Sequence, residues 1–254
     1  MLLNQPSAIT ELFDILREKR QKGFAVLIDP DKATPEHLSQ LVPLAVAAGA
    51  TCILVGGSLM NTQHLNRTLL CIRSLSSLPL ILFPGSSQQL SAHADAILFL
   101  SLISGRNPEF LIGNQVLAAP AIREAGIATM PTGYMIIDGG APTTASYISN
   151  TQPIPANKPD IAACTALASG MLGLKLMYLD TGSGAPHPVA VDIIKAVRKN
   201  TKLPIITGGG IRSVQAAAAA WKAGADVVVI GNMLESEPSF VSALGEARRA
   251  FTED

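Results

Sequence analysis

Three glycine-rich segments in the second half of the chain each directly follow an apolar run. They are Tyr178-Leu-Asp-Thr-Gly-Ser-Gly184, Gly208-Gly-Gly-Ile-Arg212 and Gly231-Asn232. Glycine lets the backbone approach a ligand closely and leaves amide N–H groups free to point at it. A tight turn explains one such segment equally well, but the three together predict a phosphate-binding site.

Two aspartates offer acid–base and metal chemistry. Asp180 ends an apolar run without an adjacent basic residue. It can act as a general base toward a substrate hydroxyl, hold that hydroxyl in place, or hydrogen-bond the glycine-rich segment that follows it. Asp29 ends the first apolar run, and with the Ser58 hydroxyl it can hold Mg2+ whose other ligands are water and a diphosphate. Asp31 is expected to cap the next helix, a role that Thr34 would also serve.

Eight short apolar runs, separated by alanine-rich helical stretches, must position these residues. Such runs are typical of strands buried on both faces of a parallel sheet. Eight of them in alternation with helices predict an α/β fold, a closed (β/α)8 TIM barrel with eight parallel strands. An open doubly wound sheet is disfavoured because the first run is followed by Asp29-Pro-Asp-Lys32, which contains no glycine. The predicted strands are Phe24–Asp29, Cys52–Val55, Leu80–Phe83, Ala96–Leu100, Tyr134–Asp138, Lys175–Asp180, Ile205–Thr207 and Val227–Ile230.

In such barrels the active site lies at the carboxyl ends of the strands, where the aspartates and the glycine-rich segments fall. A weak internal repeat supports the βα units, since Leu78-Pro-Leu-Ile-Leu82 resembles Leu203-Pro-Ile-Ile-Thr207. Residues 139–173 hold four prolines and few strand signals, and we interpret them as an elaborated connection between the fifth and sixth strands. We expect one domain over residues 1–254.

Composition excludes several classes of protein. The chain has 254 residues, 48% of them hydrophobic, and its formal net charge is zero. The absence of a basic excess argues against a nucleic-acid-binding protein. Three widely spaced cysteines predict neither a disulfide framework nor a zinc site. The uncharged stretch 38–63 is interrupted by proline and glycine, so we expect no membrane span. The N-terminal residues do not resemble a signal peptide, and we expect a cytoplasmic protein.

The ordered motifs resemble those of the geranylgeranylglyceryl phosphate synthase family, which includes the heptaprenylglyceryl phosphate synthases. The resemblance runs from about residue 24 to residue 234 and implies a modified TIM barrel. It also implies an Mg2+-dependent prenyltransferase of ether-lipid synthesis. Such an enzyme joins a prenyl diphosphate, here expected to be geranylgeranyl diphosphate, to the 3-hydroxyl of sn-glycerol 1-phosphate and releases diphosphate. The matching motifs are Asp29-Pro-Asp-Lys, Val55-Gly-Gly-Ser58, Phe110-Leu-Ile-Gly-Asn-Gln115, Pro131-Thr-Gly-Tyr134 and the three glycine-rich segments.

The resemblance also assigns roles to residues. Asp29 and Ser58 would hold Mg2+ on the diphosphate, and Asp180 would contact the reacting hydroxyl. The family has a glutamate where this chain has Asp180, and some bacterial relatives have a lysine where it has Leu27. Relatives form dimers or larger assemblies, so a homo-oligomer is expected. The expected ligands of sn-glycerol 1-phosphate are Tyr178, Leu179, Asp180, Thr181, Gly182, Ser183, Gly184, Gly209, Gly210, Gly231 and Asn232.

Two other functions are compatible with the same phosphate site. One is a phosphosugar isomerase or lyase, which would need two acid–base groups and neither Mg2+ nor a diphosphate. The other is a barrel that binds a phosphate ligand without catalysis, for which the aspartate at position 180 is the only argument. A requirement for Mg2+ with release of pyrophosphate separates the first from a prenyltransferase, and turnover excludes the second. The length of the prenyl chain is left open.

Overall fold

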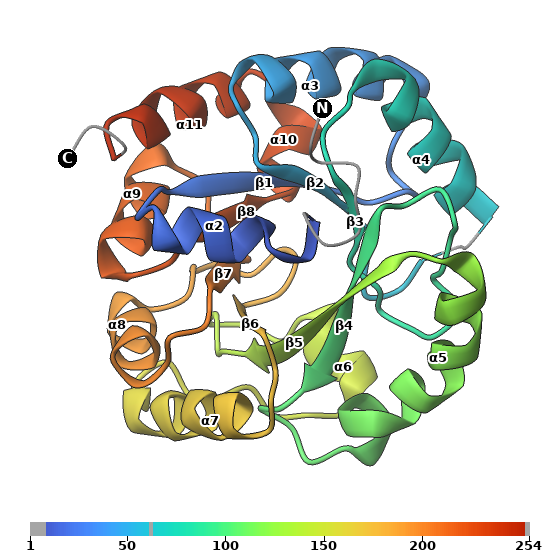
Figure 1. The fold of residues 1–254 in the computed structure, drawn as a ribbon. Coiled ribbons are helices and arrows are strands. Elements are labelled where there is room, and N and C mark those ends of the chain that lie inside the picture. The colour runs from blue at the N-terminus through green and yellow to red at the C-terminus, as the bar shows by residue number, and fades with distance from the viewer. Residues whose placement is uncertain (1–8, 61–62, 252–254) are drawn as a thin grey trace.

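Eight parallel strands close into a barrel in chain order, with β1 paired to β8 (Figure 1). The computed structural model describes residues 9–60 and 63–251. This architecture confirms the TIM barrel predicted from the apolar runs. The strands are β1 Gly23–Ile28, β2 Cys52–Val55, β3 Leu80–Leu82, β4 Ala96–Leu102, β5 Ala128–Ile136, β6 Leu176–Asp180, β7 Ile205–Gly208 and β8 Val227–Ile230.

Most helices form an outer ring around these strands, whereas the helix Leu12–Glu18 lies across one end of the barrel and adds Phe13 to the interior cluster (Figure 1). Successive side chains of a strand point to opposite faces, so one set fills the barrel and the other packs against the helices. In β2, Leu54 belongs to the interior cluster, while Ile53 and Val55 pack in the outer cluster. The helices are α2 Leu12–Glu18, α3 Pro35–Ala47, α4 Gln63–Leu75, π-helix η1 Glu109–Gly113, α5 Asn114–Ala125, α6 Thr144–Ser149, α7 Pro159–Met171, α8 Val191–Asn200, α9 Val214–Ala223, α10 Asn232–Ser236 and α11 Phe240–Arg249.

Two connections depart from regular alternation. Residues 83–95, between β3 and β4, form turns and contain no helix. Residues 137–175, between β5 and β6, hold both α6 and α7, which agrees with the elaborated connection expected there. The connection after β3 therefore covers the barrel without a helix, whereas the connection after β5 contributes two helices. No helix in the described part of the chain combines the length and the apolar character that crossing a membrane requires.

The predicted bounds of the fifth strand were wrong. The strand spans Ala128–Ile136 and not Tyr134–Asp138. Pro131 and Gly133 are residue types common in turns, yet both lie within the strand, and Pro131 pairs with Phe99 of β4. A proline only removes one N–H donor, and the Pro131 carbonyl still accepts a hydrogen bond from the backbone N–H of Lys175 on the other side.

The amino ends of β7 and β8 are held by a buried ion pair. Asp226, just before β8, accepts hydrogen bonds from Arg198 Nη1 at 3.0 Å and from the backbone N–H of Ile205 at 2.8 Å. Lys22 Nζ lies 3.9 Å from the other carboxylate oxygen. One aspartate thus connects the end of α8 to the start of β7 and β8.

The same arrangement recurs on the opposite side of the barrel, at β3 and β4. Asp95 precedes β4 and accepts from Arg73 Nη2 at 2.6 Å and from the backbone N–H of Leu80 at 2.7 Å. Arg73 lies in the last turn of α4, as Arg198 lies in the last turn of α8. These two arginine–aspartate clamps lie at equivalent places in the two copies of the weak sequence repeat, since Leu80 and Ile205 are matching positions.

Candidate active site

A cavity of about 590 Å³ opens at the carboxyl ends of the strands. Its wall changes character from one end to the other. One end is polar and is built by the loops after β1, β2, β6, β7 and β8. The other end is apolar and is built by β4, η1, α5 and α6. Representative lining residues are Asp29, Ser58, Asp180, Ser183, Gly209 and Asn232 at the polar end, and Phe99, Leu100, Phe110, Ala118, Ile122 and Ile148 at the apolar end.

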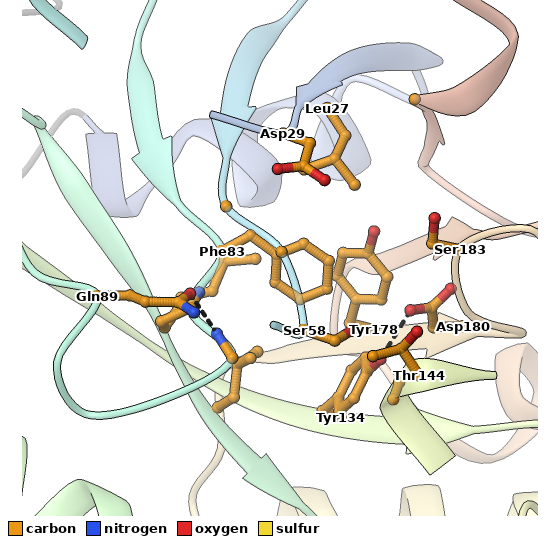
Figure 2. A pocket seen from close by; sticks show the side chains of 18 of the residues that line it. Leu27, Asp29, Ser58, Phe83, Gln89, Tyr134, Thr144, Tyr178, Asp180 and Ser183 are labelled. Atoms are coloured by element: carbon orange, nitrogen blue, oxygen red, sulfur yellow. Dashed lines mark hydrogen bonds between the residues drawn. The ribbon is translucent and has the colours of Figure 1, made fainter. Parts of the chain in front are cut away.

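Asp180, the last residue of β6, lies at the junction of the two ends. Its side chain is buried, and each carboxylate oxygen accepts one hydrogen bond from a neutral donor. The Tyr134 hydroxyl donates to Oδ2 at 2.7 Å (Figure 2). The backbone N–H of Gly182 donates to Oδ1 at 2.8 Å. Among the described residues no lysine, arginine or histidine forms an ion pair with it.

Burial raises the pKa of Asp180 above its ordinary value, and the two hydrogen bonds oppose that shift. The pKa values of Tyr134 and Tyr178 are raised further above theirs, by burial first and by the nearby carboxylate second. Both tyrosines therefore stay protonated, and the Tyr134 hydroxyl serves as a hydrogen-bond donor to Asp180. The site combines a carboxylate of increased basicity with neutral hydroxyl groups, which suits proton abstraction from an alcohol.

Three aromatic rings form a cluster on one side of this carboxylate (Figure 2). Phe83 stacks on Tyr178 with ring centroids 4.7 Å apart and meets Tyr134 edge-on at 5.9 Å. The two tyrosine rings meet edge-on at 5.7 Å. The rings lower the local polarity around Asp180, which strengthens electrostatic interactions there.

The glycine-rich loops adopt backbone conformations that side chains rarely allow. Gly209 and Gly210 have φ of 78° and 63°. A Cβ on Gly209 would lie 2.4 Å from the Thr181 hydroxyl, and one on Gly210 would lie 2.4 Å from the backbone of His187. Ser183 Oγ donates to Asn232 Oδ1 at 2.9 Å, which ties the loop after β6 to the start of α10. The loops thus form a tight polar surface that a larger residue would disrupt.

The structure brings most of the predicted acceptor ligands to the cavity wall. Three lie elsewhere. Leu179 points into the outer core because it alternates with Tyr178 and Asp180. Thr181 is buried away from the wall, and Gly182 serves the site through its N–H bond to Asp180. Those that line the cavity are Tyr178, Asp180, Ser183, Gly184, Gly209, Gly210, Gly231 and Asn232.

Asp29 and Ser58 also line the cavity, as the metal prediction requires. Burial raises the pKa of Asp29, and its Oδ1 accepts the backbone N–H of Asp31 at 3.1 Å. Lys32 Nζ lies 4.0 Å from Asp29 and 3.0 Å from Glu235. The described residues contain no group of three or more histidine, cysteine, aspartate or glutamate side chains that could hold a metal. Asp29 and Ser58 fit a divalent cation that takes most of its ligands from a diphosphate and water.

Asp31 does not cap the next helix. The Thr34 hydroxyl does so, by accepting the backbone N–H of His37 at 3.2 Å. Asp31 Oδ1 instead lies 3.1 Å from His64 Nδ1. Thr34 directly precedes a proline at the first helical position, which is the usual place for a cap.

The sequence did not indicate two parts of the site. One is the bond from Tyr134 to Asp180, which depends on the register between β5 and β6. The other is the set of residues that forms the apolar wall, where Gln115 donates hydrogen bonds to the carbonyls of Leu100 and Phe110 and so fixes η1 against β4. The motif 110–115 was visible in the sequence, but its place in the cavity was not.

Comparisons with known proteins agree with this site. The model of the PcrB family matches residues 13–248. The geranylgeranylglyceryl phosphate synthase of Chitinophaga pinensis is 50% identical over 234 residues, which cover 92% of this chain and 93% of the relative. The enzyme of the same name from Methanothermobacter marburgensis is 40% identical over 233 residues, 92% of this chain and 94% of the relative.

A solved structure shares the fold closely. The (S)-3-O-geranylgeranylglyceryl phosphate synthase of Thermoplasma acidophilum, in complex with substrate sn-glycerol-1-phosphate, superposes with a TM-score of 0.88. It is 33% identical and covers 96% of this chain and 98% of its own. These matches confirm the resemblance and the enzyme class expected from the motifs. The chain is a prenyltransferase that belongs to the PcrB family, together with the geranylgeranylglyceryl phosphate synthases.

Proposed function

We propose that this enzyme joins the prenyl group of a prenyl diphosphate to the 3-hydroxyl of sn-glycerol 1-phosphate, as a step of ether-lipid synthesis. Geranylgeranyl diphosphate is the expected donor. One observation carries the proposal: a single cavity joins a polar, glycine-rich end to an apolar end, and the buried carboxylate of Asp180 lies between them. Each end fits one of the two substrates, so the reacting atoms meet beside Asp180.

The polar end fits the acceptor. Gly209, Gly210 and Gly231 line this part of the wall. Backbone N–H groups of such loops commonly hold a phosphate without a cation. The complex of the Thermoplasma acidophilum enzyme with sn-glycerol-1-phosphate supports the same acceptor here. With the phosphate held by these loops, the glycerol hydroxyls extend toward Tyr178 and Asp180.

The apolar end fits the donor. A prenyl chain loses its contact with water along β4, η1 and α5, which is favourable by about 25 cal/mol for each Å² of apolar surface buried. A phosphosugar has no group that would use this wall, so the cavity favours a prenyl donor over the isomerase or lyase alternative. Asp29 and Ser58 would hold Mg2+, which when bound neutralises charge on the departing diphosphate.

The reaction breaks the bond between C1 of the prenyl group and the diphosphate oxygen, and it forms an ether bond from C1 to the glycerol oxygen. C1 becomes electron-poor as the diphosphate leaves with the bonding electron pair. The glycerol hydroxyl attacks C1 and loses its proton to Asp180. The aromatic wall of Phe83 and Tyr178 excludes water that would otherwise compete as the nucleophile.

Incubation with sn-glycerol 1-phosphate and a series of prenyl diphosphates tests the proposal. Mass spectrometry should show one prenyl ether, and pyrophosphate should appear in equal amount. EDTA should stop the reaction and added Mg2+ should restore it. Absence of a prenyl ether with every donor would overturn the proposal.

The enantiomeric acceptor sharpens this test. A ligand held at its phosphate and at both hydroxyls has a defined handedness. We expect sn-glycerol 3-phosphate to be a poorer substrate by about 10²-fold in kcat/KM. Equal rates would mean that only the phosphate is held.

A further inference from the structure

The hydroxyl of Tyr134 is buried beside Asp180, at the junction of the polar and apolar ends of the cavity. It neither donates nor accepts a proton in the proposed reaction. Tyr134 pairs with Tyr178 across β5 and β6, and Ile136 pairs with Asp180. Because alternate residues of a strand face the same side, Tyr134 and Asp180 both face the barrel interior as diagonal neighbours. Their side chains meet there, with 2.7 Å between the hydroxyl and Oδ2 (Figure 2).

The surroundings leave few other groups that could control the carboxylate. The strand β6 contributes Tyr178, the other titratable group close to it. Phe83, which directly follows β3, contributes only its ring. The N–H of Gly182 occupies Oδ1, and β7 contributes Gly208 beside the Tyr178 hydroxyl. Within residues 9–60 and 63–251, Tyr134 is thus the one side chain that donates a hydrogen bond to Asp180.

We propose that Tyr134 is a positioning residue that holds Oδ2 of Asp180, so that the carboxylate turns a remaining lone pair toward the glycerol hydroxyl. An aspartate has one methylene, which keeps its carboxylate close to β6. The ring of Tyr134 spans from the neighbouring strand to reach it. This inference rests on the proposed function, because it assigns the substrate proton to Asp180.

A positioning role has a consequence for pH that a packing role lacks. A hydrogen bond donated to a carboxylate favours its ionised form, which is the form that can accept a proton. Loss of the Tyr134 hydroxyl therefore raises the pKa of Asp180 further, in the direction that burial already sets. Activity should then be lost on the acid side first.

The variant Tyr134→Phe keeps the ring and its contacts with Phe83 and Tyr178 and removes only the hydroxyl. We expect kcat/KM to fall about tenfold on the acid side of the profile, with a much smaller loss on the alkaline plateau. The pH profile should be recorded for this variant, the wild type and Tyr147→Phe. Tyr147 is 83% exposed on α6, and its variant should reproduce the wild-type profile.

A double-mutant cycle shows whether Tyr134 acts through Asp180. In an Asp180→Ala background the second change, Tyr134→Phe, should have no further effect on kcat. The proposal is overturned if Tyr134→Phe lowers kcat equally with and without Asp180. It is also overturned if the folded Tyr134→Phe variant keeps the acid limb of the wild-type pH profile of kcat/KM.

A readout without turnover separates this inference from the proposed function. Calorimetric binding of sn-glycerol 1-phosphate, repeated across the same pH range, should weaken on the acid side at higher pH in Tyr134→Phe than in the wild type. Failure of the wild type to form any prenyl ether contradicts the proposed function. An unchanged pH dependence of both binding and turnover in the variant contradicts the role of Tyr134 alone.

Discussion

Two aspartates at opposite ends of the barrel are buried to nearly the same extent but have opposite surroundings. Asp226, at the amino end of β8, is 5% exposed, and Asp180, at the carboxyl end of β6, is 7% exposed. Asp226 faces Arg198 and Lys22. Asp180 faces a tyrosine hydroxyl and a backbone N–H.

The different partners of these two aspartates suit one to stabilising the fold and the other to catalysis. A carboxylate paired with a guanidinium is engaged in a charge-assisted hydrogen bond and is not available to a substrate. A buried carboxylate that has only neutral partners is more basic, and its folded environment tolerates the charge less well. The amino end of the barrel therefore uses an aspartate to hold strands together, whereas the carboxyl end keeps one available for chemistry.

The largest effect is expected from Asp29, the second aspartate at the carboxyl end. Asp29→Ala should lower kcat by about 10³-fold or more, because the departing diphosphate loses the cation that its side chain would hold. Circular dichroism and calorimetric binding of sn-glycerol 1-phosphate should stay unchanged. The neighbouring variant Asp31→Ala is the control, since Asp31 interacts with His64 and does not line the cavity. Near-normal turnover in folded Asp29→Ala would remove the metal assignment.

At the amino end the expected loss is one of stability. Asp226→Asn leaves Arg198 without its anionic partner and should lower the free energy of unfolding by about 3–5 kcal/mol. Urea denaturation measures this, and kcat of the folded fraction should remain close to that of the wild type. Asp192→Asn, at an exposed ion pair with Lys195, should change stability by less than about 0.5 kcal/mol. Equal stability of the two variants would show that the clamp contributes nothing.

Asp180→Asn should show the reverse pattern. An amide keeps the shape of the side chain but cannot accept the substrate proton, so kcat should fall by about 10²-fold. Single-turnover kinetics with a saturating acceptor check this directly. A small loss with an unchanged pH–rate profile would mean that Asp180 positions the hydroxyl and does not abstract its proton.

The smallest effect concerns the stability cost of Asp180. A carboxyl whose folded-state pKa lies above its ordinary 3.8 stabilises the fold at acid pH, and this contribution is lost as pH rises through the folded pKa. Asp180→Asn removes the buried charge and should raise Tm by about 2–4 °C at neutral pH. The difference should vanish below pH 3.8, which calorimetric melts across the pH range can verify. A lower Tm for the Asn variant at neutral pH would contradict the assignment of a destabilising charge.

The strands could be predicted from the sequence because burial on both faces leaves an uninterrupted apolar run. The predicted bounds of β2 and β8 match the structure. The beginning of β5 was missed because Pro131 and Gly133 are turn residues in most contexts. The absence of a helix between β3 and β4 had a local signal in the turn residues Pro84-Gly-Ser-Ser87, which the prediction of alternating strands and helices did not use.

The loops of the site were predictable for a related reason. Glycines such as Gly209 and Gly210 mark backbone conformations, which are local properties. The partner of Asp180 was not predictable, because it depends on how β5 and β6 are aligned and not on either segment alone. Leu179 and Thr181 show the converse error, in which a contiguous motif was assigned to the ligand although alternate side chains of a strand point away from it.

The two arginine–aspartate clamps lie on opposite sides of the closed barrel, at β3–β4 and β7–β8. Each fastens a helix end and two strands with groups that lie away from the cavity wall. This separation makes the rim tolerant of sequence change: loops at the carboxyl end can be exchanged, lengthened or given new side chains while the opposite end keeps the strands in register. A library of loop variants built on this chain should therefore retain folded members at a higher frequency than the same library built after either clamp is removed.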